Sequence, residues 1–133
     1  MKKINLLILT LSMASLFLTA NVMNAQNNHW VKLGTRVVNM HSDHDEILVT
    51  YREGSFSKIK IKVRKAPIHM FNMHIEFGNG SHEDIAINKR MNLGGDDIFG
   101  LTGKHDRIIH KISFNYKSVP SARKRAVITV WGK

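Results

Sequence analysis

The sequence predicts an all-β fold, a single antiparallel β-sandwich of about eight short strands. Beyond residue 30, apolar and polar residues alternate with a period of two, and no long segment keeps apolar residues at helical spacing. Turn signals rich in Gly, Asn, Ser and Pro separate the alternating segments at short intervals. A jelly roll or a small barrel is the alternative arrangement of the same strands.

The clearest strand lies at 56–64, where apolar and cationic residues alternate strictly. Its apolar members are expected to face the core and its cations to face solvent. The cations are Lys58, Lys60, Lys62 and Arg64. Residues 71–77 and 109–116 alternate in the same way, and in the second segment His110 shares a face with Ile112 and Phe114. We therefore expect His110 at the core or its boundary.

Shorter strands are expected where β-branched and aromatic residues gather. These segments are 32–39, 46–51, 84–88, 97–101 and 125–131, with turns at 53–55, 78–81, 94–97 and 118–121. Trp30 and Trp131 lie near the two ends of this region. We expect the terminal strands to lie side by side, so that both indoles close the core.

The first 25 residues have a different pattern. Lys2 and Lys3 precede the apolar run from Leu6 to Leu18, and small residues follow at Ala20 and Ala25. This order is typical of a secretory signal peptide, cleaved after Ala25 or alternatively after Ala20. The run is shorter than the roughly 20 residues that span a bilayer, so no transmembrane segment is expected after cleavage. We therefore expect a signal peptide at 1–25, one β-sandwich domain at 26–133, and an exported protein, periplasmic or extracellular.

The chain is strongly basic, with a formal net charge of +10, and it contains no cysteine. Removal of residues 1–25 takes away two lysines and no acidic residue, which leaves 108 residues with a charge of +8. The absence of cysteine excludes disulfides, cysteine nucleophiles and thiolate metal sites. The positive charge predicts an anionic partner. Export favours an anionic glycan, lipid or extracellular polymer over intracellular nucleic acid.

The predicted anion-binding residues are the alternating cations of segment 56–64: Lys58, Lys60, Lys62 and Arg64. On one strand face, successive cations lie about 6.6 Å apart, a spacing that a linear polyanion can follow. Lys65 and the basic run 123–125 would widen this field if they lie nearby. The alternative is a solvated sheet face, or an edge strand whose lysines discourage aggregation.

Acidic residues cluster in or beside predicted turns. They are Asp43, Asp45, Glu46, Glu83, Asp84, Asp96, Asp97 and Asp106. If these loops converged, their oxygens would supply the roughly six to eight ligands that calcium takes. Segment 41–46 also combines histidine with carboxylates, as zinc sites do, but its spacing matches no specific motif. We expect solvated turns and no cofactor, with calcium as the alternative.

No catalytic motif is present: the chain lacks a Gly-x-Ser-x-Gly elbow, a phosphate-binding glycine loop and a dinucleotide fingerprint. We therefore expect a non-enzymatic binding or cell-envelope interaction protein. The alternatives are a calcium-supported carbohydrate-binding or adhesion module, and a structural accessory protein without a small ligand.

Short patterns of strand and turn residues extend over nearly all of residues 30–131. They include Trp30…Leu33-Gly34…Val37, Asp43-x-Asp45-x-Ile47-x-Val49, Phe77-Gly78-Asn79-Gly80, Leu101-x-Gly103 and Arg107-x-Ile109…Ile112-x-Phe114-x-Tyr116. In this order they resemble a group of small exported bacterial all-β proteins of unknown function. The Ala25-Gln26 junction is similar to signal cleavage sites common in Bacteroidetes. The resemblance implies one all-β domain in the envelope or outside the cell, and it implies no activity.

Within that pattern, Arg107 stands at the start of a strongly apolar strand, just after Gly103 and next to Asp106. A guanidinium at this position is suited to bracing loop carbonyls or a carboxylate. We expect its role to be structural.

Overall fold

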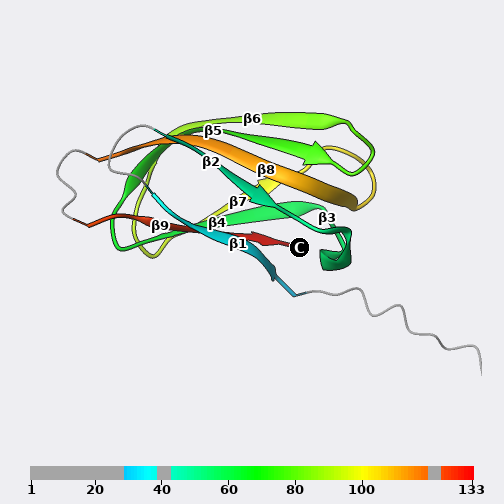
Figure 1. The fold of residues 1–133 in the computed structure, drawn as a ribbon, viewed down its shortest axis with the longest axis horizontal. Coiled ribbons are helices and arrows are strands. Elements are labelled where there is room, and N and C mark those ends of the chain that lie inside the picture. Colours follow the sequence, from blue (N-terminus) through cyan, green and yellow to red (C-terminus); the bar gives the residue numbers. More distant parts are fainter. Residues whose placement is uncertain (1–28, 39–42, 120–123) are drawn as a thin grey trace, which may run out of the picture.

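The computed structural model describes residues 29–38, 43–119 and 124–133. They form two antiparallel sheets that pack face to face as two layers (Figure 1). The prediction of an antiparallel β-sandwich is confirmed. Within the described ranges the chain forms no α-helix, and one 3-10 turn, η2 (Tyr51–Glu53), interrupts the strands.

The four-stranded sheet has the order β1-β9-β4-β7. Its strands are β1 (Val31–Val37), β9 (Val127–Gly132), β4 (Lys58–Arg64) and β7 (Asp96–Gly100). The second sheet has the order β2-β8-β5-β6, and the short strand β3 pairs with β8 beside it. These strands are β2 (Asp43–Leu48), β8 (Arg107–Ser118), β5 (Ile68–Phe77), β6 (His82–Met91) and β3 (Ser55–Phe56). The first and last strands of the domain, β1 and β9, pair with each other, as expected (Figure 1).

The core lies between the sheets and consists of the apolar members of the alternating strands. In β4, the inward residues are Ile59, Ile61 and Val63, each at most 1% exposed. The facing strands contribute Met70, Met73, Ile75 and Phe77 from β5, and Ile109, Ile112, Phe114 and Tyr116 from β8, each at most 3% exposed. The period-two pattern of the sequence therefore sets which side of each strand is buried.

Two glycines allow close approach between elements. A Cβ atom on Gly34 of β1 would lie 2.7 Å from the Ile47 side chain, and one on Gly132 of β9 would lie 2.6 Å from the Phe56 ring. Both distances are shorter than carbon–carbon contacts allow. The absence of a side chain at these two positions therefore lets Ile47 and Phe56 pack directly against the backbones of β1 and β9.

Two register shifts in the pairing of β5 with β8 place His110 and Phe71 on the outer side of the sheet, although alternation predicted that they face the core. The register between β5 and β8 shifts at Glu76/Phe77, so Ile109 and Ile112 both face the core and His110 between them is exposed. A second shift at Met70/Asn72 leaves Phe71 half-buried on the outer side while Met70 is fully buried. The expectation that His110 lies at the core is therefore wrong, because one extra residue in a strand reverses its alternation.

Candidate functional site

The two outer faces of the sandwich differ in chemistry. The outer side of β1-β9-β4-β7 is here named the basic face. It contains all four predicted anion-binding residues, of which Lys58 and Arg64 are exposed and Lys60 and Lys62 half-buried. Because β4 lies between β9 and β7, the alternative of an edge strand protected by lysines is wrong.

Two tryptophans hold the central lysine of the basic face. The Lys60 ammonium lies 4.5 Å from the ring centroid of Trp30 and 5.3 Å from that of Trp131. The ammonium of Lys133 lies 5.9 Å from the Trp30 ring. Cation–π attraction at these distances fixes the charge of Lys60 in the middle of the face.

The expectation that both tryptophans close the core is therefore wrong. Both are half-buried, and Trp131 pairs in register with Lys32 on one side and Lys60 on the other. Strand alternation explains this position, because Val130 and Gly132 occupy the inward positions on either side of Trp131.

Among the described residues, one ion pair crosses the basic face. The ammonium of Lys62 lies 3.6 Å from the Asp96 carboxylate of β7, and both side chains are more than 40% exposed. Strands β1, β9 and β4 contain no acidic residue, and Asp97 of β7 instead binds Lys89 of β6. An exposed pair of this kind contributes at most about 1 kcal/mol to stability. No acidic residue of β1, β9 or β4 offsets the charge of the other described cations on this face.

The basic face ends in a hollow with a volume of about 400 Å³. Its lining consists of Val37, Lys65, Lys124, Arg125 and Val127. Arg64 pairs in register with Val127, which places the last cation of β4 beside this hollow. Lys65, Lys124 and Arg125 thus lie near the end of the predicted row of cations, which is the condition under which they would widen its positive field. Arg123 lies outside the described residues.

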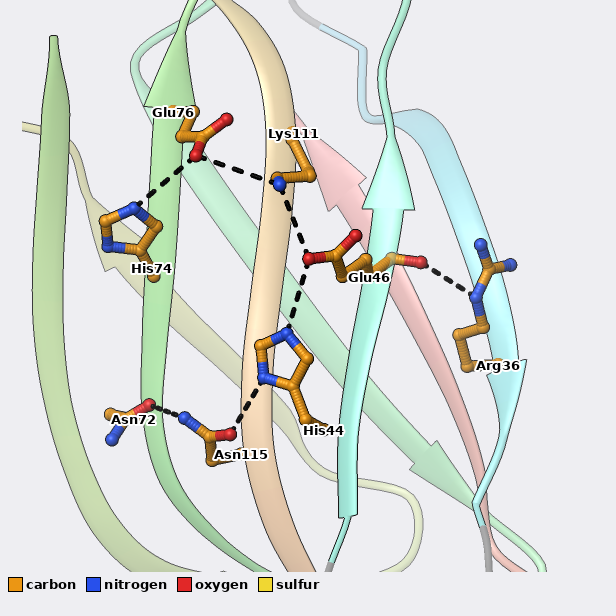
Figure 2. Close-up of polar contacts among 8 residues, drawn as sticks. All are labelled: Arg36, His44, Glu46, Asn72, His74, Glu76, Lys111 and Asn115. Atoms are coloured by element: carbon orange, nitrogen blue, oxygen red, sulfur yellow. Dashed lines mark hydrogen bonds and ion pairs between the residues drawn. The ribbon is translucent and has the colours of Figure 1, made fainter.

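The outer side of β2-β8-β5-β6 is here named the charge-paired face, and Figure 2 shows a part of it. The Lys111 ammonium lies between two carboxylates, 3.3 Å from Glu46 and 3.7 Å from Glu76. His74 in turn lies 3.9 Å from Glu76 through Nε2. At the sheet edge, Arg36 Nε donates to the backbone oxygen of Glu46 at 2.9 Å. Charges of opposite sign thus alternate across neighbouring strands.

A row of hydrogen bonds runs across the same face. His44 Nδ1 donates to Asn115 Oδ1 at 2.9 Å, and Asn115 Nδ2 donates to Asn72 Oδ1 at 2.7 Å (Figure 2). The hydrogen bond to Asn115 raises the pKa of His44, burial opposes this, and Glu46 adds to it. The pKa of Glu46 is lowered, first by its hydrogen bond with His44 and then by that with Lys111. His44 and Glu46 thus each favour the charged form of the other.

Three histidines lie at one end of the charge-paired face. His74 Nδ1 is 2.5 Å from an Asp84 oxygen, and the rings of His74 and His82 are 5.3 Å apart. Together with His110 and Glu76, they line a hollow of about 300 Å³. Across 29–38, 43–119 and 124–133, however, no group of three or more His, Asp or Glu side chains is arranged to hold a metal ion.

The acidic residues do not converge in loops as the calcium alternative requires. Most of them stand in strands, where Asp45 accepts a hydrogen bond from the Tyr116 hydroxyl at 2.7 Å and Glu83 accepts from the backbone and hydroxyl of Thr102 at 3.0 Å. The sequence predicted that these acidic residues lie in or beside turns. Asp45 lies inside β2 instead, whereas Glu83 is the second residue of β6, just after the predicted turn at 78–81. Of segment 41–46, His41 and Ser42 lie outside the described residues.

Arg107 braces a loop through a backbone carbonyl, as its position after Gly103 led us to expect. One guanidinium nitrogen donates to the backbone oxygen of Thr102 at 3.4 Å, and the other to the Ser81 hydroxyl at 2.5 Å. The guanidinium carbon lies 3.3 Å from the centroid of the Phe77 ring. The side chain therefore connects three segments at one end of the sandwich.

Sequence reasoning missed the exposed aliphatic residues of the basic face. Val37 is 58% exposed and Ile98 is 55% exposed, and Ile98 pairs in register with Lys60. The sequence showed only that Val37 and Ile98 belong to the alternating segments 32–39 and 97–101. Which strands become neighbours of β4 is a matter of tertiary pairing, so the sequence did not indicate that these residues join its cations.

The fold and the two faces define a small all-β sandwich domain with one basic and one charge-paired surface. The chain belongs to the family described as domain of unknown function DUF2541, whose model matches residues 6–132. No curated protein matches the chain in sequence. Within the described residues, no helix is long and apolar enough to cross a bilayer.

Among solved structures, the chain is similar to AlgX from Pseudomonas aeruginosa, with a TM-score of 0.55 and 13% sequence identity. The similarity covers 81% of this chain but only 27% of AlgX. At this identity, the similarity shows a shared fold. It assigns no site or activity to this chain.

Proposed function

We propose that this protein is an exported, non-enzymatic binding protein that recognises an anionic component of the cell envelope through its basic face. One observation carries the proposal: Lys58, Lys60, Lys62 and Arg64 lie on the outer side of a central strand, and further cations surround them. These further cations are Lys32, Lys65, Lys124, Arg125 and Lys133.

The contrast between the two faces supports this proposal. On the charge-paired face, Lys111 has two carboxylate neighbours. On the described part of the basic face, Lys62 has one, and no ion pair involves Lys58 or Arg64. Alternate cations of β4 are about 6.6 Å apart along the strand. This spacing is shorter than the Debye length of about 8 Å at physiological ionic strength, so the cations repel one another. A bound polyanion would relieve that repulsion.

The location rests on the first 25 residues. Lys2, Lys3 and the apolar run that follows direct the chain to export, and cleavage after Ala25 leaves Gln26 as the first residue. Mass spectrometry of the protein recovered from cells tests this step. A mature N-terminus at Gln26 is expected, and an intact Met1 in protein recovered from the cytoplasm would contradict export.

Binding is tested with a charge variant and a matched control. Lys58→Gln with Arg64→Gln removes two exposed cations from the basic face, and Lys104→Gln with Lys117→Gln removes two exposed cations elsewhere. Heparin affinity is measured over a series of salt concentrations by calorimetry. The first pair should weaken binding about tenfold and lower the slope against log salt by about two, whereas the control pair should change little.

Two outcomes would overturn the proposal. One is equal weakening by both pairs, which would mean that net charge alone attracts heparin. The other is failure of the wild-type protein to bind heparin, polyphosphate or anionic vesicles at low ionic strength.

A further inference from the structure

Apolar side chains interleave with the cations of the basic face. The register places Lys32, Trp131, Lys60 and Ile98 in one row across β1, β9, β4 and β7. Ile98 is 55% exposed, and Val37, at the far end of the same face, is 58% exposed. The face therefore combines positive charge with exposed aliphatic side chains and two half-buried indoles.

Side-chain hydrogen-bond acceptors are scarce on the described part of this face. The carboxylate of Asp96 is paired with Lys62, and the hydroxyls of Thr35 and Thr129 lie 3.4 Å apart and bind one another. A sugar chain presents hydroxyls that need acceptors as well as donors. A surface of lipid phosphates needs only donors and cations, with apolar groups beside them.

We infer that the basic face docks on an anionic phospholipid surface, an inference that rests on the proposed function and names its partner. Lysine and arginine side chains bind lipid phosphates, while Trp30, Ile98 and Val37 enter the boundary between headgroups and acyl chains. The indole nitrogen of Trp131 is buried in the protein, so Trp131 supports Lys60 from below this layer. Indoles favour that boundary because one end of the ring is apolar and the other polar. Long cationic side chains lie along apolar surface with their charge in water, which suits them to the same depth.

The strength of such docking depends on two contributions. One is electrostatic attraction to anionic lipid, which salt weakens, and the other is burial of apolar side chains, which salt does not weaken. The two contributions come from different residues of the basic face, so substitutions can separate them.

The apolar contribution is tested with two matched pairs of variants. Val37→Ser with Ile98→Ser removes two exposed aliphatic side chains from the basic face. Leu48→Ser with Ile108→Ser removes two from the other sheet, where they are 67% and 48% exposed. All variants are made in the full chain and purified as the cell processes it, so that the N-terminal segment contributes equally to each.

Binding is measured by co-sedimentation with vesicles of phosphatidylcholine containing phosphatidylglycerol, and with vesicles of phosphatidylcholine alone. Heparin binding of the same variants is measured in parallel. Substitution of Val37 and Ile98 should weaken binding to anionic vesicles roughly tenfold and leave heparin binding unchanged. The control pair should change neither.

Tryptophan fluorescence gives a second measurement. The chain has two tryptophans, Trp30 and Trp131, and both lie on the basic face. Lipids brominated near the headgroup should therefore quench the emission on binding.

The outcomes separate this inference from the proposed function. Salt-sensitive heparin binding without vesicle binding would overturn membrane docking and leave an anionic polymer as the partner. Equal effects of the two aliphatic pairs, or vesicle binding without quenching, would also overturn it. Failure to bind both heparin and anionic vesicles would overturn both proposals.

Discussion

Gly132→Ala should destabilise the domain, because the added methyl group has no room. An ideal Cβ on Gly132 lies 2.6, 2.8 and 3.0 Å from three carbons of the Phe56 ring. Carbon atoms prefer separations of about 3.5–4.0 Å, so the ring or the strand must move by about 1 Å. Phe56 is only 2% exposed, and Gly132 pairs with both Val31 and Ile59, so neither side has free space.

The expected loss follows from two opposing contributions. Overpacking of a well-packed core costs about 1–3 kcal/mol. Replacing glycine by alanine restricts the unfolded chain and returns about 0.4–1 kcal/mol. The net decrease in the free energy of unfolding is therefore about 1–2 kcal/mol, which lowers the Tm by roughly 5–15 °C in a domain of this size. Urea and thermal unfolding followed by circular dichroism measure both quantities.

A matched glycine provides the control. Gly100 of β7 also pairs with β4, but a Cβ there would meet no atom within 4 Å. Gly100→Ala should leave the Tm unchanged or raise it slightly. Phe56→Leu in the Gly132→Ala background should recover about 1 kcal/mol relative to additivity. A Gly132→Ala protein as stable as the wild type, or as the Gly100→Ala protein, would refute the packing argument.

The remaining predictions concern two polar contacts. Arg107→Lys should lower the free energy of unfolding by about 1–2 kcal/mol, since lysine cannot donate to Thr102 and Ser81 in the same fork; an unchanged Tm would contradict this. Asn115→Ala should lower the pKa of His44 measured by NMR, because the Asn115 hydrogen bond is the main cause of its raised value. A raised His44 pKa stabilises the folded state at pH values below the unfolded-state pKa of about 6.5, and this stabilisation disappears as the pH rises through the folded-state pKa. The variant should therefore lose more stability in acid than in base. Equal losses at both pH values would exclude the histidine as the cause.

Much of the fold was predictable from local pattern. Alternation in segment 56–64 predicted β4 and its two faces, because strand side chains point to opposite sides with a period of two. The same rule failed at His110 and Phe71, where register shifts between β5 and β8 reverse the alternation. Such a shift depends on the partner strand, which local sequence does not specify.

The candidate site was predictable in part. Lys58, Lys60, Lys62 and Arg64 share one face because they alternate on one strand. The tryptophans that flank Lys60 and the valines of the end hollow come from strands distant in sequence. Clustering of acidic residues in the sequence did not predict their partners. Asp45 and Glu83 stand near other acidic residues in the sequence, but they accept hydrogen bonds from Tyr116 and Thr102 in the structure.

The sequence by itself determined the all-β class, the inward and outward sides of the regular strands, and the excess of positive charge. These properties depend on residue type and on spacing of two along the chain. Only the tertiary structure decided that cations, indoles and aliphatic side chains share the outer side of β1-β9-β4-β7, while carboxylates and histidines gather on the other sheet. The physical reason is that neighbours across a sheet are set by hydrogen-bonded pairing between distant segments, which local alternation constrains but does not choose.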